Sequence, residues 1–356
     1  MNAKMLEEIA NAVLYEGYML YPYRASSVKN KQRWNFGVLY PKNYSELQKG
    51  TDPCRSQTEC LISGTGETRI NVKVRFLQAI SRVVGEFDPP VTTLAENVEP
   101  KYRTTQDART GEPRPQEWQE ASERDVKLDA RTVAELEAEP LTQSFTLSPS
   151  RANEEVLHPD GLIAGIIVRK QRGIVGQASL SATKLREGLY KITLTVANET
   201  VMRAAEDGHR DRALMQALLS AHSVLNVEQG EFVSLLETPE EFVEAASQCK
   251  NVGTWPVLVG EQGQHGAMLS SPIILYDYPQ IAPESAGDLF DGTEIDEILA
   301  LRILTLTDEE KREMREGDAR ARQILERTEA LPEEEFLKLH GAVRGMQRKP
   351  SAEDQQ

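Results

Sequence analysis

Residues 69–76 read RINVKVRF, and apolar and polar side chains alternate at every position of this stretch. The apolar side chains, which share one face, are Ile70, Val72, Val74 and Phe76. The polar side chains on the opposite face are Asn71, Lys73 and Arg75. A period of two is typical of a strand with one face in a core and the other in solvent. The stretch therefore predicts an antiparallel sheet with one covered face.

Further strands are predicted where short β-prone runs lie between turn signals. They are 144–148, 162–170, 174–182, 188–196, 255–260 and 271–279. Residues 224–236 predict a hairpin that turns at Gln229 and Gly230. The SGTGET stretch at 63–68 also favours a hairpin turn, because it precedes a strand and lacks the ending of a phosphate-binding loop.

Helices are predicted where apolar residues recur every three to four positions. One is expected at the N-terminus around Met5, Ile9 and Val13, and another around 213–221. From Gly292 onward the pattern is helical, with a capping box at Thr307 and Glu310. The predicted fold class is α+β, with an antiparallel β-rich core in two parts and a helical C-terminal arm.

Four segments are predicted along the chain. Residues 1–97 form an α+β domain, 98–140 a charged linker, 141–290 a β-rich domain with two helices, and 291–356 the helical arm with a disordered end. The linker is inferred from its 18 charged residues and four prolines among 43, which bury too little apolar surface to offset the entropy of ordering. A short helix is expected near its end, in TVAELEAE.

Composition predicts a cytoplasmic protein without a membrane span. The longest apolar run, GLIAGIIV at 161–168, is far shorter than the roughly 20 residues that a spanning helix needs. Glu7 and Glu8 interrupt the N-terminal apolar pattern, unlike in a signal peptide. Three cysteines suit a reducing compartment. The net charge of −15 argues against a nucleic-acid partner.

Motifs for known chemistry are weak in this sequence, and we predict no metal and no cofactor. Cys54 and Cys60 are spaced more widely than zinc ligands usually are, and no second pair follows. No H-E-x-x-H or G-x-S-x-G occurs. An acidic cluster at Asp288, Asp291, Glu294, Asp296 and Glu297 either binds a divalent cation or caps the helix after Thr293, and capping is favoured.

The one unusual surface feature is a tyrosine-rich, basic block near the N-terminus, YEGYMLYPYRASSVKNKQRWNFGVLY at 15–40. Residues 15–50 carry a net charge of +4 in an otherwise acidic chain. Tyr, Trp and Arg are common interface anchors; alternatively, most of these tyrosines pack a core. The residues predicted to bind a partner or ligand are Tyr21, Tyr23, Arg24, Lys29, Lys31, Arg33, Trp34, Tyr276 and Tyr278.

Four blocks of the sequence resemble a family of uncharacterised bacterial proteins that is associated with gene clusters for nickel–iron hydrogenases and their maturation. They are the start of the basic block (15–37), GTWPVLVG (253–260), SSPIILYDYPQIAPESAGDLFDGTEIDEIL (270–299) and ALPEEEFLKLHG (330–341). The resemblance implies an accessory or assembly role, with a hydrogenase subunit or maturation factor as the partner. The chain lacks the paired CxxC motifs that ligate nickel in hydrogenase large subunits.

The sequence thus favours a non-enzymatic role, as a cytoplasmic accessory or scaffold protein that binds another protein. One alternative is an enzyme of unfamiliar type, acting on an anionic small molecule through the basic loop 24–34 together with carboxylates such as Asp277, Asp288 and Asp291. Another is a purely structural subunit of a larger complex.

Overall fold

The computed structural model describes residues 3–16, 36–94, 100–104, 118–203, 208–280, 303, 305–316 and 319–330. Its helices are α1 (Ala3–Tyr15), α3 (Lys42–Leu47), α4 (Val133–Ala138), α5 (Arg210–Leu214), α6 (Val243–Ser247), α8 (Asp308–Glu316) and α9 (Ala319–Glu329). Its strands are β1 (Arg55–Val91), β2 (Arg103–Thr104), β3 (Trp118–Thr132), β4 (Leu141–Leu147), β5 (Ser150–Leu157), β6 (Ile163–Gln171), β7 (Ile174–Arg186), β8 (Leu189–Asn198), β9 (Leu219–Val233), β10 (Trp255–Leu258) and β11 (Ala267–Ser271).

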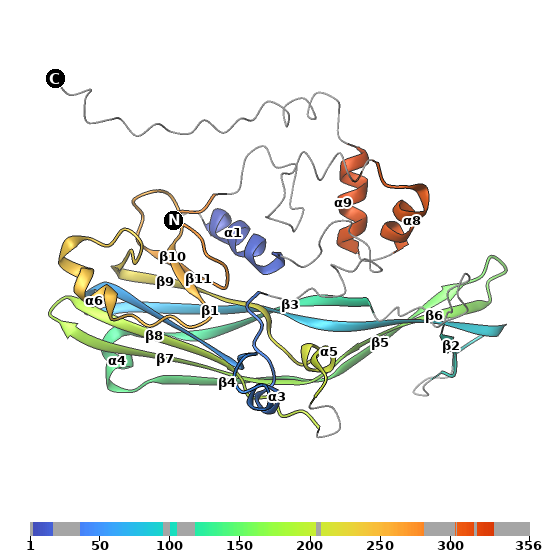
Figure 1. Ribbon diagram of the computed structural model, residues 1–356, viewed down its shortest axis with the longest axis horizontal. Coiled ribbons are helices and arrows are strands. Elements are labelled where there is room, and N and C mark those ends of the chain that lie inside the picture. The colour runs from blue at the N-terminus through green and yellow to red at the C-terminus, as the bar shows by residue number, and fades with distance from the viewer. Residues whose placement is uncertain are drawn as a thin grey trace.

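Strand β1 organises the whole molecule. It runs for 37 residues and contains the 69–76 stretch, whose predicted strand is confirmed. Along one edge it pairs first with β8 and then with β3; along the other it pairs with β9 and then with β6. All pairings are antiparallel, and Figure 1 shows β1 running most of the length of the molecule. The predicted antiparallel β-rich core is therefore confirmed, and β1 joins its parts into one sheet.

The sheet folds over on itself, so that two stretches of it face each other. One stretch contains β8, β7 and β4, and the other contains β9, β1 and β3 (Figure 1). Fully buried side chains from both stretches meet in one apolar cluster, among them Ile62, Val72, Phe76, Leu180 and Ile192. Each of these side chains contributes about 1.5–3 kcal/mol through its burial. The side of RINVKVRF that the sequence assigned to a core is thus the inner face of this sandwich.

The bend in β1 lies at 65–68. Gly64 pairs with Gly230 and Arg69 with Glu228, so four residues of β1 lie opposite the single residue Gln229. The Thr68 hydroxyl donates to the Gln229 carbonyl at 2.7 Å and holds this bulge. Both hairpin turns predicted here are wrong, because Gly64 and Gly230 serve a bulge and a close approach of two backbones instead of chain reversals.

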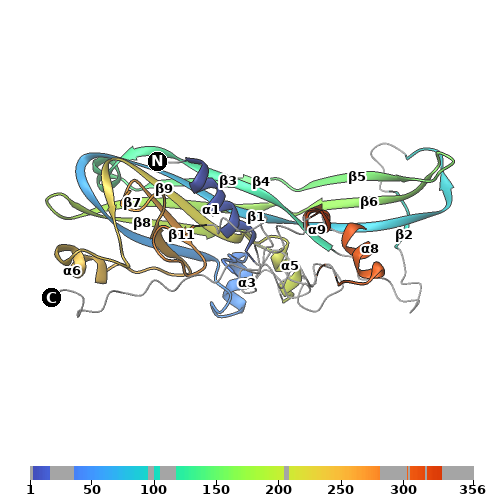
Figure 2. The ribbon, with the colours of Figure 1, turned by 90° about the horizontal axis from the view of Figure 1, so that it is seen from above.

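Beyond the sandwich the sheet continues as a projecting arm. The distal part of β1 pairs with β6 and β2 there, and β5 adds to the outer edge of β6. Figure 2 shows β5, β6 and β2 extending away from the sandwich. At the base of the arm the buried Gln78 accepts from Arg124 at 2.9 Å and donates to the carbonyl of Arg172 at 2.8 Å.

Helices cover the outer face of the β9–β1–β3 stretch (Figure 1). Helix α1 is confirmed, and its apolar stripe of Leu6, Ile9 and Val13 packs on β9, β10 and β11. The described part of the C-terminal region is helical too, and Met314 and Ile324 of α8 and α9 join a second cluster. The predicted capping box is confirmed, since the backbone N–H of Glu310 donates to the Thr307 hydroxyl.

Two segments differ from the sequence-based expectation. Residues 118–132, placed in a charged linker, form β3, which pairs with β1 along 69–82. Their charged side chains alternate with the buried Val126 and Leu128, so a strand buries enough apolar surface to order. The helix expected at 213–221 is wrong for most of that range, since α5 ends at Leu214 and β9 begins at Leu219. The short helix in TVAELEAE is confirmed as α4.

The packing of β4 on β7 depends on Gly176, because an added Cβ there would lie 2.1 Å from Cζ of Phe145. The Phe145 ring in turn stacks on Phe76, with ring centroids 5.8 Å apart. We predict that Gly176→Val displaces this ring and lowers the free energy of unfolding by about 1–3 kcal/mol, measured by urea denaturation. Gly266→Ala is the control, because no atom lies within 4 Å of its added Cβ. If the two variants are equally stable, the packing of β4 on β7 does not depend on Gly176.

Candidate functional site

Most of the residues predicted to bind a partner lie outside the described residues. These are Tyr21, Tyr23, Arg24, Lys29, Lys31, Arg33 and Trp34. The acidic cluster at 288–297 lies outside them as well. Tyr276 and Tyr278 are described, and they lie on the segment 272–280 that follows β11. Two features of the described chain bear on function: this segment, and a polar cluster under α1.

The segment that carries Tyr276 is fixed at both ends. Its start, Pro272, is buried, and its end is held by Asp277, whose carboxylate accepts from the Ser234 hydroxyl at 2.5 Å and from the backbone N–H of Leu258 at 2.7 Å. The N–H of Tyr278 donates to the Leu258 carbonyl at 2.8 Å, and its side chain packs against the sandwich core. Asp277 therefore has a structural role here, because its carboxylate binds the backbone of β10.

Between these anchors the side chains alternate. Ile273 and Leu275 pack against the α1 cluster, whereas Ile274 and Tyr276 are 76% and 87% exposed. Trp255 of β10 is 44% exposed, and it pairs with Ser271, the residue immediately before the segment. The chain thus holds three large apolar side chains in solvent on a backbone that has little freedom. We call Trp255, Ile274 and Tyr276 the edge patch.

The edge patch is close in the fold to one end of the basic block. The described chain resumes at Phe36, which is 43% exposed, and Gly37 packs directly against Pro272. An added Cβ at Gly37 would lie 2.6 Å from the Pro272 Cβ, and the Gly37 carbonyl accepts from the N–H of Ala221 at 2.8 Å. Two regions of the predicted surface, more than 230 residues apart in sequence, are therefore joined at this contact.

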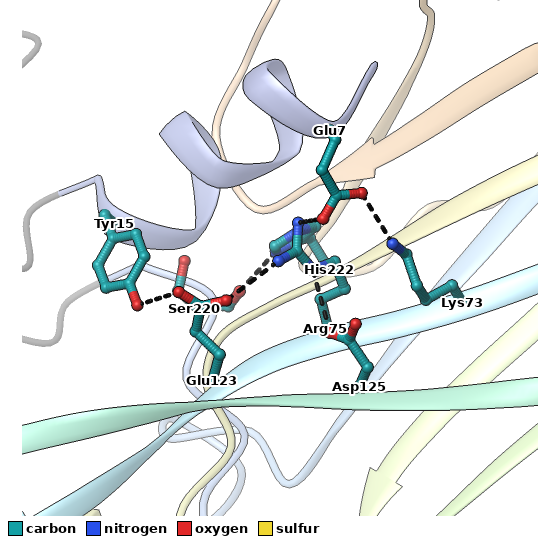
Figure 3. Close-up of polar contacts among 8 residues, drawn as sticks. All are labelled: Glu7, Tyr15, Lys73, Arg75, Glu123, Asp125, Ser220 and His222. Carbon is teal, nitrogen blue, oxygen red and sulfur yellow. Dashed lines mark hydrogen bonds and ion pairs between the residues drawn. The ribbon is translucent and has the colours of Figure 1, made fainter. Parts of the chain in front are cut away.

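The polar cluster lies between α1 and the outer face of the sheet (Figure 3). At its centre Arg75 of β1 is only 2% exposed, and its guanidinium contacts three carboxylates. The distances are 3.1 Å to Glu7 of α1, 3.1 Å to Asp125 and 3.5 Å to Glu123 of β3. On the polar face of RINVKVRF, Asn71 is exposed as alternation predicts, but Arg75 is buried, so the solvent exposure predicted for Arg75 is wrong. A buried guanidinium needs such partners, because an unpaired one would cost several kcal/mol.

Helix α1 is tied to this cluster at both of its ends. Near its start Glu7 accepts from the Lys73 ammonium at 2.9 Å, and this bond with the charge of Arg75 holds the pKa of Glu7 below its usual value, against an opposing effect of burial. At its end the Tyr15 hydroxyl donates to Glu123 at 2.6 Å, and the Ser220 hydroxyl donates to the Val13 carbonyl at 2.9 Å. Tyr15 is also the first residue of the basic block, so these bonds fix that end of the block.

His222 of β9 completes the cluster. It is fully buried, and its Nδ1 lies 2.9 Å from the Ser220 carbonyl. A carbonyl only accepts, so Nδ1 carries the proton and the buried Nε2 holds the lone pair. Burial, together with the charges of Arg75 and Lys73, lowers the pKa of His222 to about 4, against the opposing effect of the Ser220 bond. The imidazole is neutral at pH 7 and enclosed, which suits a structural role for it.

The thiols are not set up for chemistry in this structure. The three cysteines are free, and Cys60 is completely buried. Burial raises the pKa of the Cys60 thiol far above its usual range and that of Cys249 to about 11. Thiolate is the reactive form, so both groups are inert near neutral pH. Within the described ranges, no group of three His, Cys, Asp or Glu side chains could hold a metal ion.

No protein-family model matches the chain, and no curated protein matches it. In the part of the chain that the structure describes, no helix is both long and apolar enough to cross a membrane.

Sequence reasoning missed the polar cluster, although two signals pointed to it. Arg75 is a charged residue in the middle of a long β-prone stretch. Glu7 is a charged residue beside the apolar stripe of α1. Neither signal says that the helix covers the strand. That relation links residues 66 and more positions apart and exists only after folding.

The buried His222 predicts a specific loss of stability with falling pH. In the unfolded chain a histidine takes up a proton near pH 6.5, whereas in the folded chain His222 does so only near pH 4. Between pH 6.5 and 5 the unfolded state therefore binds more protons, and His222 should remove about 1.5 kcal/mol of stability. The pKa of Glu7 is lowered from 4.5, so the stability that its ionised form contributes is lost only below pH 5.

The test is urea denaturation of the wild type and His222→Asn at pH 6.5 and pH 5. Asparagine keeps a donor for the Ser220 carbonyl but does not titrate. The variant should lose about 1.5 kcal/mol less than the wild type over this interval. Parallel losses in the two proteins would show that His222 is not held neutral.

Proposed function

We propose that the protein is a cytoplasmic accessory or scaffold protein that binds another protein through a surface composed of the edge patch and the basic block. The observation that carries this proposal is the rigid exposure of Tyr276 and Ile274. Their backbone is held by Asp277 and Tyr278, so little entropy remains to be lost when a partner covers them. Rigid aromatic side chains are typical interface anchors.

The basic block supports the same proposal through its charge. A chain with a net charge of −15 repels acidic partners in general, whereas the +4 segment from 15 to 50 attracts an acidic patch locally. Its two flanks are held in place, by Tyr15 at the end of α1 and by Gly37 against Pro272. The proposed partner therefore presents an apolar pocket beside acidic groups. A nickel–iron hydrogenase subunit or maturation factor is the specific candidate, and it rests on the sequence resemblance alone.

Site-specific photo-crosslinking in the native host tests the partner surface. A benzoyl-phenylalanine at position 276 should capture one protein that is not captured from position 47, where Leu47 on α3 is 57% exposed and serves as the matched control. Capture should fall by about tenfold or more in Ile274→Ala, because a buried anchor typically contributes over 1 kcal/mol. Identical capture from both positions would refute the proposal. Repeating the experiment in cells without hydrogenase expression tests the specific partner.

Charge reversal tests the basic block separately. Lys29→Glu, Lys31→Glu and Arg33→Glu, combined in one chain, should abolish capture from position 276 while leaving the melting temperature and the circular dichroism spectrum unchanged. If this variant is captured as fully as the wild type, the basic block is not part of the proposed surface. The alternative function, an enzyme for an anionic small molecule at 24–34, predicts instead that phosphate or carboxylate ligands raise the melting temperature of the wild type but not of this variant.

A further inference from the structure

Strand β5 forms the outer edge of the arm. Within the described residues it pairs only with β6, and all eight of its residues are exposed. Figure 2 shows it running along the outside of the arm, with β6 on its inner side. An edge strand presents a row of backbone N–H and C=O groups that can pair with another strand. What decides its partner is the pattern of side chains along it.

The charges along β5 are ordered. Arg151 lies near its start, and Glu154 and Glu155 lie near its end. Charged side chains at an edge discourage pairing with arbitrary strands. A second β5 that approaches antiparallel, however, brings its negative end to the positive start of the first. Two copies of the edge are therefore complementary in charge when they pair antiparallel, and they repel each other when they pair parallel and in register.

Symmetry restricts the possible alignments. A two-fold axis perpendicular to the sheet leaves each face of the sheet on the same side in both copies. Two residues that lie opposite each other must therefore point to the same face, so their sequence numbers must differ by an even number. Two such alignments pair seven of the eight residues, one centred on Asn153 and one on Glu154. The alignment on Glu154 sets this carboxylate against its own copy. The alignment on Asn153 sets Arg151 opposite Glu155 of the second copy, twice by symmetry.

The surroundings favour the alignment on Asn153. Arg151 lies opposite Lys170 of β6, so an incoming carboxylate would meet two positive side chains on adjacent strands. Glu154 binds the Arg169 guanidinium at 2.6 Å within its own chain, and the alignment on Asn153 leaves this ion pair in place. The Arg151 guanidinium also donates to the Asn153 side chain at 3.2 Å, which keeps it over the centre of the strand.

We propose that the chain forms a two-fold symmetric dimer in which β5 of one copy pairs antiparallel with β5 of the other, centred on Asn153. The two arms then form one continuous sheet. In Figure 1 the arm and the strands of the edge patch, β10 and β11, lie at opposite ends of the molecule. The dimer therefore leaves both edge patches open, and it stands independently of the proposed partner surface.

A charge-exchange experiment tests the pairing. Arg151→Glu and Glu155→Arg each convert two attractive cross-strand pairs into two repulsive ones and should raise the dissociation constant of the dimer by about tenfold or more. An equimolar mixture of the two single variants should dimerise again, since every Glu of one then faces an Arg of the other. The double variant, Arg151→Glu with Glu155→Arg, should dimerise like the wild type. The readout is sedimentation equilibrium of the purified full chain over a range of concentrations.

Glu67→Arg is the control, because Glu67 is exposed on the bulge of β1, away from β5, and its replacement changes the charge by the same amount. It should leave the dissociation constant unchanged. A wild type that remains monomeric at all concentrations would overturn the proposal. Single variants that dimerise like the wild type would also overturn it, because association would then use another surface. Crosslinking from position 276 is unaffected by either result, so this proposal and the partner surface can fail separately.

Discussion

The continuous backbone ladder of β1 is the constraint on which the rest of the structure depends. A strand of 37 residues has donors and acceptors along both edges, and nearly all must be paired when buried. Five partners, β8, β3, β2, β9 and β6, satisfy them in turn as β1 passes from the sandwich to the arm. The bulge opposite Gln229 allows this, because it lets one strand belong to both facing stretches of the sheet.

The same strand also explains why a polar cluster is buried. One face of β1 carries Val72, Val74 and Phe76 into the sandwich, and the other necessarily carries Lys73 and Arg75 beneath α1. Burying this guanidinium requires carboxylates from two further elements, namely Glu7 of α1 and Glu123 and Asp125 of β3. Buried ion pairs contribute little net stability but tolerate few alternative arrangements. The cluster therefore restrains the position of α1 and of Tyr15 at its end.

Two surfaces at opposite ends of the molecule then have different physical characters. The edge patch holds large apolar side chains on a restrained backbone, which suits a preformed site for a partner. The β5 edge is polar and charged, and its specificity comes from the order of its charges. The proposed dimer would therefore present the proposed partner surface twice.

Alternation and capping signals in the sequence alone determined that the chain builds an antiparallel sheet and where α1 and α4 form. These are local properties, set by side-chain period and by bonds between residues three or four positions apart. Only the tertiary structure decided that Gly64 and Gly230 make a bulge instead of turns, that 118–132 joins the sheet, and that Arg75 is buried. Each of these depends on which distant strand lies alongside, because a backbone hydrogen bond or an ion pair between residues 36 or more positions apart leaves no trace in the local pattern.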